Sequence, residues 1–252
     1  MTDREWGRAA RFWGLLSGVA FAVATLTYLV EALGLIGAAP VYAPSAAGQL
    51  HDEAVFLAAS FAYRNATLWD YVFRDGLFFV AWLGFLPLLL AANAATGGRR
   101  AAVQIGCAFL GAAAIFGALN AVAFFVDVDF WRNTGWAQIP AEIMVAVGRG
   151  TQFFDRLSSW CGTAANAALV IALFYLGWAF RSEAALPRRL GLVAWAGAAL
   201  CAASIVVGQI PDTEAIWNVL GLVTGVVVAP TLAIGLGLHL ARGSDAHADG
   251  PR

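Results

Sequence analysis

Two pairs of opposite charges stand at the entrances of long apolar runs, and they are the first residues that could do chemistry. Arg74 and Asp75 adjoin in the stretch WDYVFRDGLFFVAW, which covers residues 69–82. Asp155 and Arg156 follow two phenylalanines in front of a later apolar run. Guanidinium and carboxylate groups that converge at one level of a helical bundle could bind a small polar ligand. These four residues are the first candidate ligand-binding set.

The spacing of the arginines predicts that the two pairs lie at the same depth. Twenty-five residues separate Arg74 from Arg99, and the same number separates Arg156 from Arg181. In a helix each interval is about 37 Å long, which matches a hydrocarbon core plus part of the headgroup zones. Both pairs are therefore predicted to mark the same surface of a membrane.

Pairing between the two sets depends on which helices touch. If the two helices adjoin, Arg74 faces Asp155 and Asp75 faces Arg156. Neighbouring side chains on a helix diverge by about 100°, so Arg74 is expected to pair with Asp70, one turn away, rather than squarely with Asp75. The alternative is structural, because acids in a first helical turn and aromatic residues at the membrane surface make an anchor.

Three asparagines inside apolar runs form a second candidate set. Asn120, Asn166 and Asn218 belong to three different runs. Together with Pro230, which can break a helix, they predict the polar cavity of a permease-like or lipid-handling protein. No charged residue lies near the centre of a run, which argues against carriers coupled to protons or ions.

Further acids, with one histidine, could bind a divalent metal or act as general acids and bases. They lack a fixed ligand spacing such as HExxH, and solvated loops and a helix cap explain them. We therefore assign no catalytic residue and no metal ligand. The residues concerned are His51, Asp52, Glu53, Asp127, Asp129, Asp212 and Glu214.

The composition excludes several classes of protein. The chain is 61% hydrophobic and 12% charged, and every basic residue is arginine. Without lysine there is no Schiff-base chemistry, and His51 and His239 are too far apart to share one haem iron. No P-loop, dinucleotide-binding glycine pattern or nucleic-acid-binding face is present. We predict no cofactor and no nucleic-acid partner.

The apolar runs predict an all-α polytopic membrane protein with six transmembrane helices in three hairpins. Residues 1–240 form one transmembrane domain, and residues 241–252 form a short polar tail. The predicted spans cover residues 12–36, 67–95, 101–126, 157–180, 190–210 and 215–240.

Arginine placement predicts the orientation. With both termini in the cytoplasm, ten arginines lie inside and five outside, while eleven of the sixteen acids lie outside. This is the positive-inside pattern of a multi-pass protein in the bacterial plasma membrane. The expected partners are the lipid bilayer, other membrane proteins or a second copy of the chain.

The first two outer loops are long, at about residues 37–66 and 127–156. Each contains an apolar segment, 54–63 and 139–147, that is too short to span and is expected to be an interfacial or re-entrant helix. Small residues at four-residue spacing predict close helix packing at Gly14 and Gly18, and at Gly221 and Gly225.

The junction between the fourth and fifth spans, FRSEAALPRRLG at residues 180–191 followed by LVAWAGAALCAA, carries a family resemblance. Together with RAARFWG at residues 8–14, it resembles a group of uncharacterised bacterial six-helix membrane proteins. The long acidic outer loops depart from the shorter loops of that group. The resemblance implies the six-helix fold and no activity.

Three functions follow from these features. The first is a non-enzymatic membrane protein whose outer loops recognise a partner or small ligand. The second is a permease-like or lipid-handling protein with an outward-facing cavity around the three asparagines. The third is a membrane enzyme that uses the outer carboxylates.

Overall fold

The computed structural model describes residues 3–35, 40, 50–97, 100–133, 139–210 and 212–248 of the 252-residue chain. These residues form helices and no strand, which confirms the all-α prediction. The elements are α1 (Asp3–Ala32), α2 (Leu50–Ala66), α3 (Leu68–Ala95), α4 (Ala101–Asn133), α5 (Ala141–Ser182), α6 (Leu190–Val207), α7 (Glu214–Val223), the π-helical turn η3 (Thr224–Val228) and α8 (Ala229–Ala248).

Six helical stretches are long and apolar enough to cross a membrane, as predicted. The first begins at Glu5, earlier than expected, because the amphipathic entrance RAARFWG continues the helix without a break. The last combines α7, η3 and α8. The stretches are Glu5–Glu31, Leu68–Ala95, Ala101–Val126, Arg156–Ser182, Leu190–Val207 and Ala215–Gly243.

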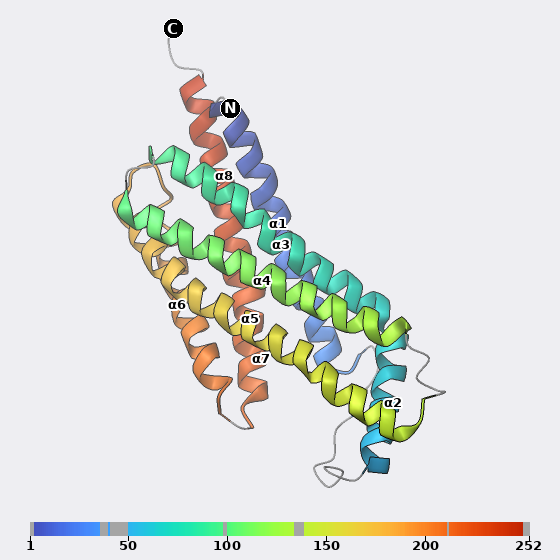
Figure 1. Ribbon diagram of the computed structural model, residues 1–252. Coiled ribbons are helices and arrows are strands. Elements are labelled where there is room, and N and C mark those ends of the chain that lie inside the picture. The colour runs from blue at the N-terminus through green and yellow to red at the C-terminus, as the bar shows by residue number, and fades with distance from the viewer. Residues whose placement is uncertain are drawn as a thin grey trace.

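The helices form three antiparallel hairpins (Figure 1). The start of α1, the end of α8 and the α3–α4 and α5–α6 connections gather at one end of the molecule, here called the terminal end. The other end carries α2, the start of α5 and the α6–α7 connection, and is called the α2 end. Which of the two faces the cytoplasm stays a prediction from the arginines.

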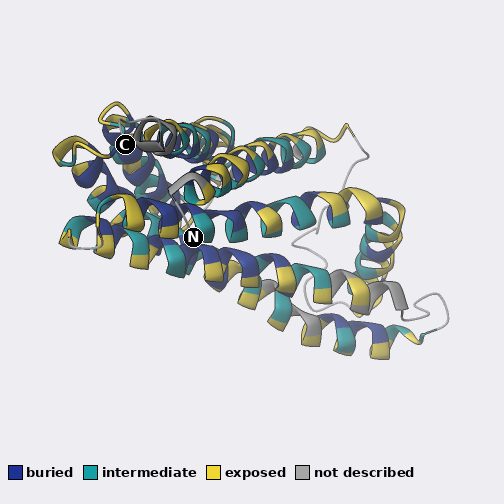
Figure 2. Cartoon of the chain, turned by 90° about the horizontal axis from the view of Figure 1, so that it is seen from above, coloured by how far each residue is buried: buried dark blue, intermediate teal, exposed yellow. Residues whose placement is uncertain are grey.

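The spans are arranged as a ring. Helix α1 packs between α8 and α3, α4 packs between α3 and α5, and α5 packs on α6. Contacts of α6 with α7, η3 and α8 close the ring. Buried residues face one another across the bundle, while exposed residues follow the outer faces and connections (Figure 2). Exposed apolar side chains on those outer faces are expected where lipid replaces water.

Small residues let α1 and α8 approach closely. A Cβ on Gly14 would lie 2.6 Å from the carbonyl oxygen of Ala233 and 3.0 Å from the Cα of Gly237. A Cβ on Gly18 would lie 2.6 Å from the side chain of Ile234. The predicted packing at Gly14 and Gly18 is therefore confirmed, because no larger residue fits this contact.

The second predicted packing pair behaves differently. Gly225 abuts Thr25 of α1, but a Cβ on Gly221 would meet no atom within 4 Å. The prediction is wrong at Gly221, because this residue borders open space at the chamber wall and not a neighbouring helix surface. The π-helical turn η3 begins just after this point and ends two residues before Pro230. Proline has no N–H to donate to the preceding turn, and a widened turn accommodates it.

The segment 139–147 is not a separate interfacial helix. From Ala141 onward it belongs to α5, a continuous helix of 42 residues. The extension is supported by α2, because Met144 packs on Phe61 and Leu57 contacts the surface over Gly148. The first apolar segment is a helix of its own, α2, as expected. At the terminal end α8 continues to Ala248, so residues 241–248 of the predicted tail are helical.

Candidate ligand-binding chamber

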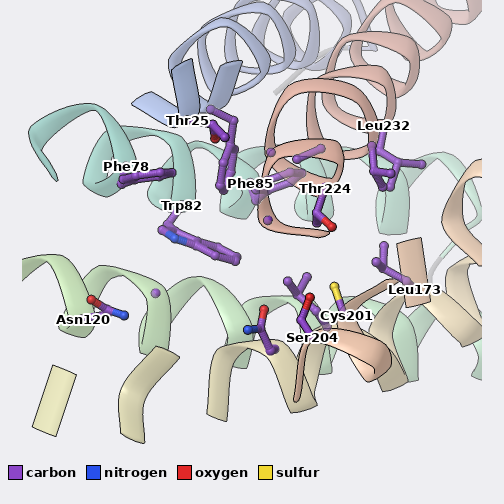
Figure 3. A pocket seen from close by; sticks show the side chains of 18 of the residues that line it. Thr25, Phe78, Trp82, Phe85, Asn120, Leu173, Cys201, Ser204, Thr224 and Leu232 are labelled. Carbon is purple, nitrogen blue, oxygen red and sulfur yellow. The ribbon is translucent and has the colours of Figure 1, made fainter. Parts of the chain in front are cut away.

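A cavity of about 430 Å³ lies inside the ring of helices, and we call it the chamber (Figure 3). Its wall is mainly apolar and rich in aromatic side chains. The ring of Phe21 on α1 contacts Trp82 at 5.0 Å and Phe85 at 5.6 Å between centroids. In Figure 3, Trp82 extends from α3 across the space toward the side that carries Asn120 and Ser204. Such a wall suits an apolar ligand.

Two glycines in the wall keep the chamber from being filled by side chains. Gly117 of α4 receives the indole of Trp82, where a Cβ would overlap the ring. Gly221 of α7 leaves its side of the wall unfilled. A larger residue at position 117 would displace Trp82, and a larger residue at position 221 would fill part of the chamber.

A second cavity of about 660 Å³, the vestibule, adjoins the chamber between α4, α5, α6 and the start of α7. The residues common to both walls are Trp82, Gly117, Asn120, Asn166, Ser204 and Trp217. The rest of the vestibule wall includes the hydroxyl and amide side chains of Ser158, Ser159, Thr163, Gln209 and Thr213 and the acid Asp212. The combined space therefore changes from polar at the α2 end to apolar inside the bundle.

The structure brings the three predicted asparagines to this space. Asn120 and Asn166 lie at the junction of the chamber and the vestibule, and Asn218 lines the chamber. Ser158 donates a hydrogen bond to Asn120 at 2.9 Å, and Tyr28 donates one to Asn218 at 3.2 Å. The amide groups of Asn120 and Asn218 are therefore held by neighbours and still border open space.

Arg74 and Asp75 form an ion cluster on the chamber wall, together with Glu31 from α1. Arg74 is 6% exposed and Asp75 is 8% exposed. The guanidinium donates from Nε and Nη2 to the two carboxylate oxygens of Asp75, both at 3.2 Å, and from Nη1 to Glu31. Tyr71 donates to the other oxygen of Glu31 at 2.5 Å.

The expectation that adjacent Arg74 and Asp75 would not pair is wrong. The long arginine side chain compensates for the divergence of the two Cβ directions, and its planar fork matches both carboxylate oxygens. Glu31, on the neighbouring helix α1, accepts a hydrogen bond from the same guanidinium. Asp70, the expected partner, is exposed.

Aromatic rings surround the guanidinium of Arg74. Its central carbon lies 5.6 Å from the ring centroid of Tyr28, 4.8 Å from that of Tyr71 and 5.4 Å from that of Phe124. Ring faces attract cations, most strongly where water is excluded. The cluster contains two carboxyl groups and one guanidinium, so its acids outnumber its bases by one.

The second half of the predicted quartet lies elsewhere. Arg156 is exposed at the start of the fourth span and lines neither cavity, and the side chain of Asp155 lies outside the described residues. Helices α3 and α5 pack on opposite sides of α4 and share no extended contact. The structure thus joins Arg74 and Asp75 to Glu31, a residue of the first predicted span that was not among the candidate site residues.

The α2 end has its own polar contacts. Arg149 of α5 donates to both carboxylate oxygens of Glu53 on α2, at 3.1 and 2.7 Å. The hydrogen bond from Arg149 holds the pKa of Glu53 below its ordinary value. Burial raises the pKa of the Tyr63 phenol, which also hydrogen-bonds to Tyr71. Among the described residues, no three acidic, histidine or cysteine side chains gather as a metal site.

Comparison of the chain with protein families, curated proteins and solved structures finds no match. The geometry of the chamber is therefore the basis for assigning a function.

Proposed function

We propose that the protein binds an amphipathic, lipid-like molecule, with its apolar part in the chamber and its polar part in the vestibule. One observation carries this proposal: the apolar chamber and the polar vestibule adjoin, and Asn120, Asn166 and Ser204 belong to the walls of both. Ligand sites commonly have volumes of about 300 to 1,000 Å³ with a few placed polar groups, and both cavities fall in this range.

The polar groups at the junction suit an amphiphile. Serine and asparagine side chains can donate to and accept from hydroxyl, carbonyl or amine groups of a ligand. Beyond them, Phe21, Trp82 and Phe85 offer apolar surface to a hydrocarbon tail. A purely polar substrate would lose water on entering the chamber and would leave most of the apolar wall without a matching partner.

Under this proposal the protein lies in the bacterial plasma membrane with the vestibule on the outer side. The arginine distribution supports this orientation, because the terminal end is rich in arginine and the α2 end is acidic. The resemblance to uncharacterised bacterial six-helix proteins supports the same setting. Handling of a lipid or lipid-like compound at the outer leaflet is the role that follows.

Photolabelling tests the proposal. The purified chain is incubated with a neutral monoacylglycerol that carries a diazirine near the end of its acyl chain, and the labelled peptides are identified by mass spectrometry. We expect adducts on chamber residues such as Leu173 and Leu232. Adducts confined to the lipid-facing residues Leu192 and Phe174, which are 61% and 53% exposed, would overturn the proposal.

A matched pair of glycine variants sharpens this test. Gly221→Leu adds a large side chain at a position that lines the chamber and where a Cβ meets no atom within 4 Å. Gly150→Leu makes the same change in an equally open position on α5 that lines neither cavity. Chamber labelling should fall in the first variant and persist in the second.

A second function is favoured by the helical unit at the α2 end. Helix α2 and the first turns of α5 are joined by the Phe61–Met144 contact and the Glu53–Arg149 ion pair, beyond the fourth span. This unit would recognise a partner protein outside the membrane. A photoreactive amino acid at Val55, which is 56% exposed, should give a discrete protein adduct in cells. The same label at Leu192 should give none.

A further inference from the structure

We propose that the amphiphile bound in the chamber is a lipophilic organic cation. This inference rests on the proposed function and adds the charge of the ligand. The ion cluster at the chamber wall, formed by Glu31, Arg74 and Asp75, carries it.

The charges that face the cavities are mainly negative. Within the described part of the chain, Arg74 is the basic side chain on either cavity wall, and it already contacts two carboxylates. The vestibule wall adds the acid Asp212. An anionic headgroup would therefore meet like charge and no basic group free of a carboxylate.

With both carboxyl groups ionised, the cluster carries one surplus negative charge, which needs compensation. Arg74 balances one of the two carboxylates, and both Arg74 and Asp75 are buried in the bundle. A net charge in a water-poor interior is costly unless an opposite charge comes close. A cation in the chamber supplies that charge, and Asp75 borders the chamber directly.

The aromatic wall is suited to the same ligand. Tyr28 and Phe124 line the chamber and already lie within 5.6 Å of the guanidinium carbon of Arg74. Trp82 and Phe78 continue this surface along α3. Ring faces stabilise organic cations that have lost their water, and alkyl or aryl groups on the cation would fill the apolar space.

Two ions of nearly equal size and opposite charge test the inference. Tetraphenylphosphonium and tetraphenylborate are each measured by equilibrium dialysis against the full-length protein in detergent, with empty micelles subtracted. We expect saturable binding of the phosphonium and not of the borate. The phosphonium should also compete with chamber labelling by the neutral monoacylglycerol.

Variants then locate the charge. Glu31→Gln removes the surplus charge without changing a cavity-lining residue, and should weaken phosphonium binding by about tenfold at typical interior screening. Asp75→Asn neutralises the cluster from the other side and should do the same, so a folding defect in one variant leaves the other. Asp70→Asn makes an equal charge change at an exposed position on α3, and should leave the affinity unaltered.

The outcomes separate the two proposals. If the neutral probe labels the chamber but the borate binds as well as the phosphonium, or both cluster variants retain full phosphonium affinity, the cation inference fails alone. If no probe reaches the chamber and Gly221→Leu changes nothing, the proposed function fails with it.

Discussion

The indole of Trp82 lies in a space left by Gly117, where a Cβ would come within 2.5 Å of the indole nitrogen. This contact between α3 and α4 places the indole in the walls of both the chamber and the vestibule. The shape of the proposed binding space therefore depends on a residue with no side chain.

Gly117→Ala is expected to displace Trp82 and to destabilise the protein by about 1 to 3 kcal/mol, as overpacking does. Gly111→Ala is the matched control on the same helix, because its Cβ would meet only Leu86 at 4.0 Å. Reversible unfolding in mixed micelles, followed by tryptophan fluorescence, measures both. Equal stability of the two variants would contradict the packing described for Trp82.

Arg74→Met should destabilise the protein by about 3 to 5 kcal/mol, because it leaves Glu31 and Asp75 without their shared partner in a buried site. Arg156→Met serves as the control, because Arg156 is exposed. The same unfolding titration compares them. A loss of ligand binding in Arg156→Met would restore the four-residue site predicted from the sequence.

Acid should release α2 from α5. The pKa of Glu53 is lowered from 4.5 by the hydrogen bond from Arg149. A lowered pKa means that the contact contributes fully above the ordinary value and loses its contribution as pH falls through the lower, folded value. The protection of α2 amides, measured as the ratio of the intrinsic to the observed hydrogen-exchange rate at each pH, should therefore decrease below about pH 4.5.

Glu53→Gln is the control for this pH dependence. In this variant the α2 amides should be less protected from hydrogen exchange than in the unsubstituted protein at neutral pH. Their protection should not decrease further below about pH 4.5. An acid response that persists in Glu53→Gln would assign the effect to another group.

The orientation can be tested by labelling in intact cells. In a background without Cys107, Cys161 and Cys201, single cysteines replace Val55 in α2 and Ala185 in the α5–α6 connection, both exposed. A membrane-impermeant maleimide should label the first in intact cells and the second only after permeabilisation. The reverse pattern would place the vestibule on the cytoplasmic side.

Hydropathy predicted the six spans because each apolar run is long enough to cross the hydrocarbon core, where it must form a helix to satisfy its backbone hydrogen bonds. Asn120, Asn166 and Asn218 were also identified from sequence, since a polar residue in such a run needs a partner or a cavity. The role of Glu31 was missed, because its partner lies on another helix and no spacing within the chain reports that contact. The continuous α5 was missed because its first turns are stabilised by α2, through Phe61 and Met144.

The π-helical turn η3 has a consequence for how the chamber is encoded. A π turn holds one residue more than the α-helix it interrupts, so the faces of α7 and α8 are offset by one position. If the same residues formed an unbroken α-helix instead, α7 would be rotated by about 100° relative to α8. Asn218 and Gly221 would then turn away from the chamber, although every side chain in its wall would still be present. The shape of the chamber therefore depends on the helical register between α7 and α8 as well as on which residues line it.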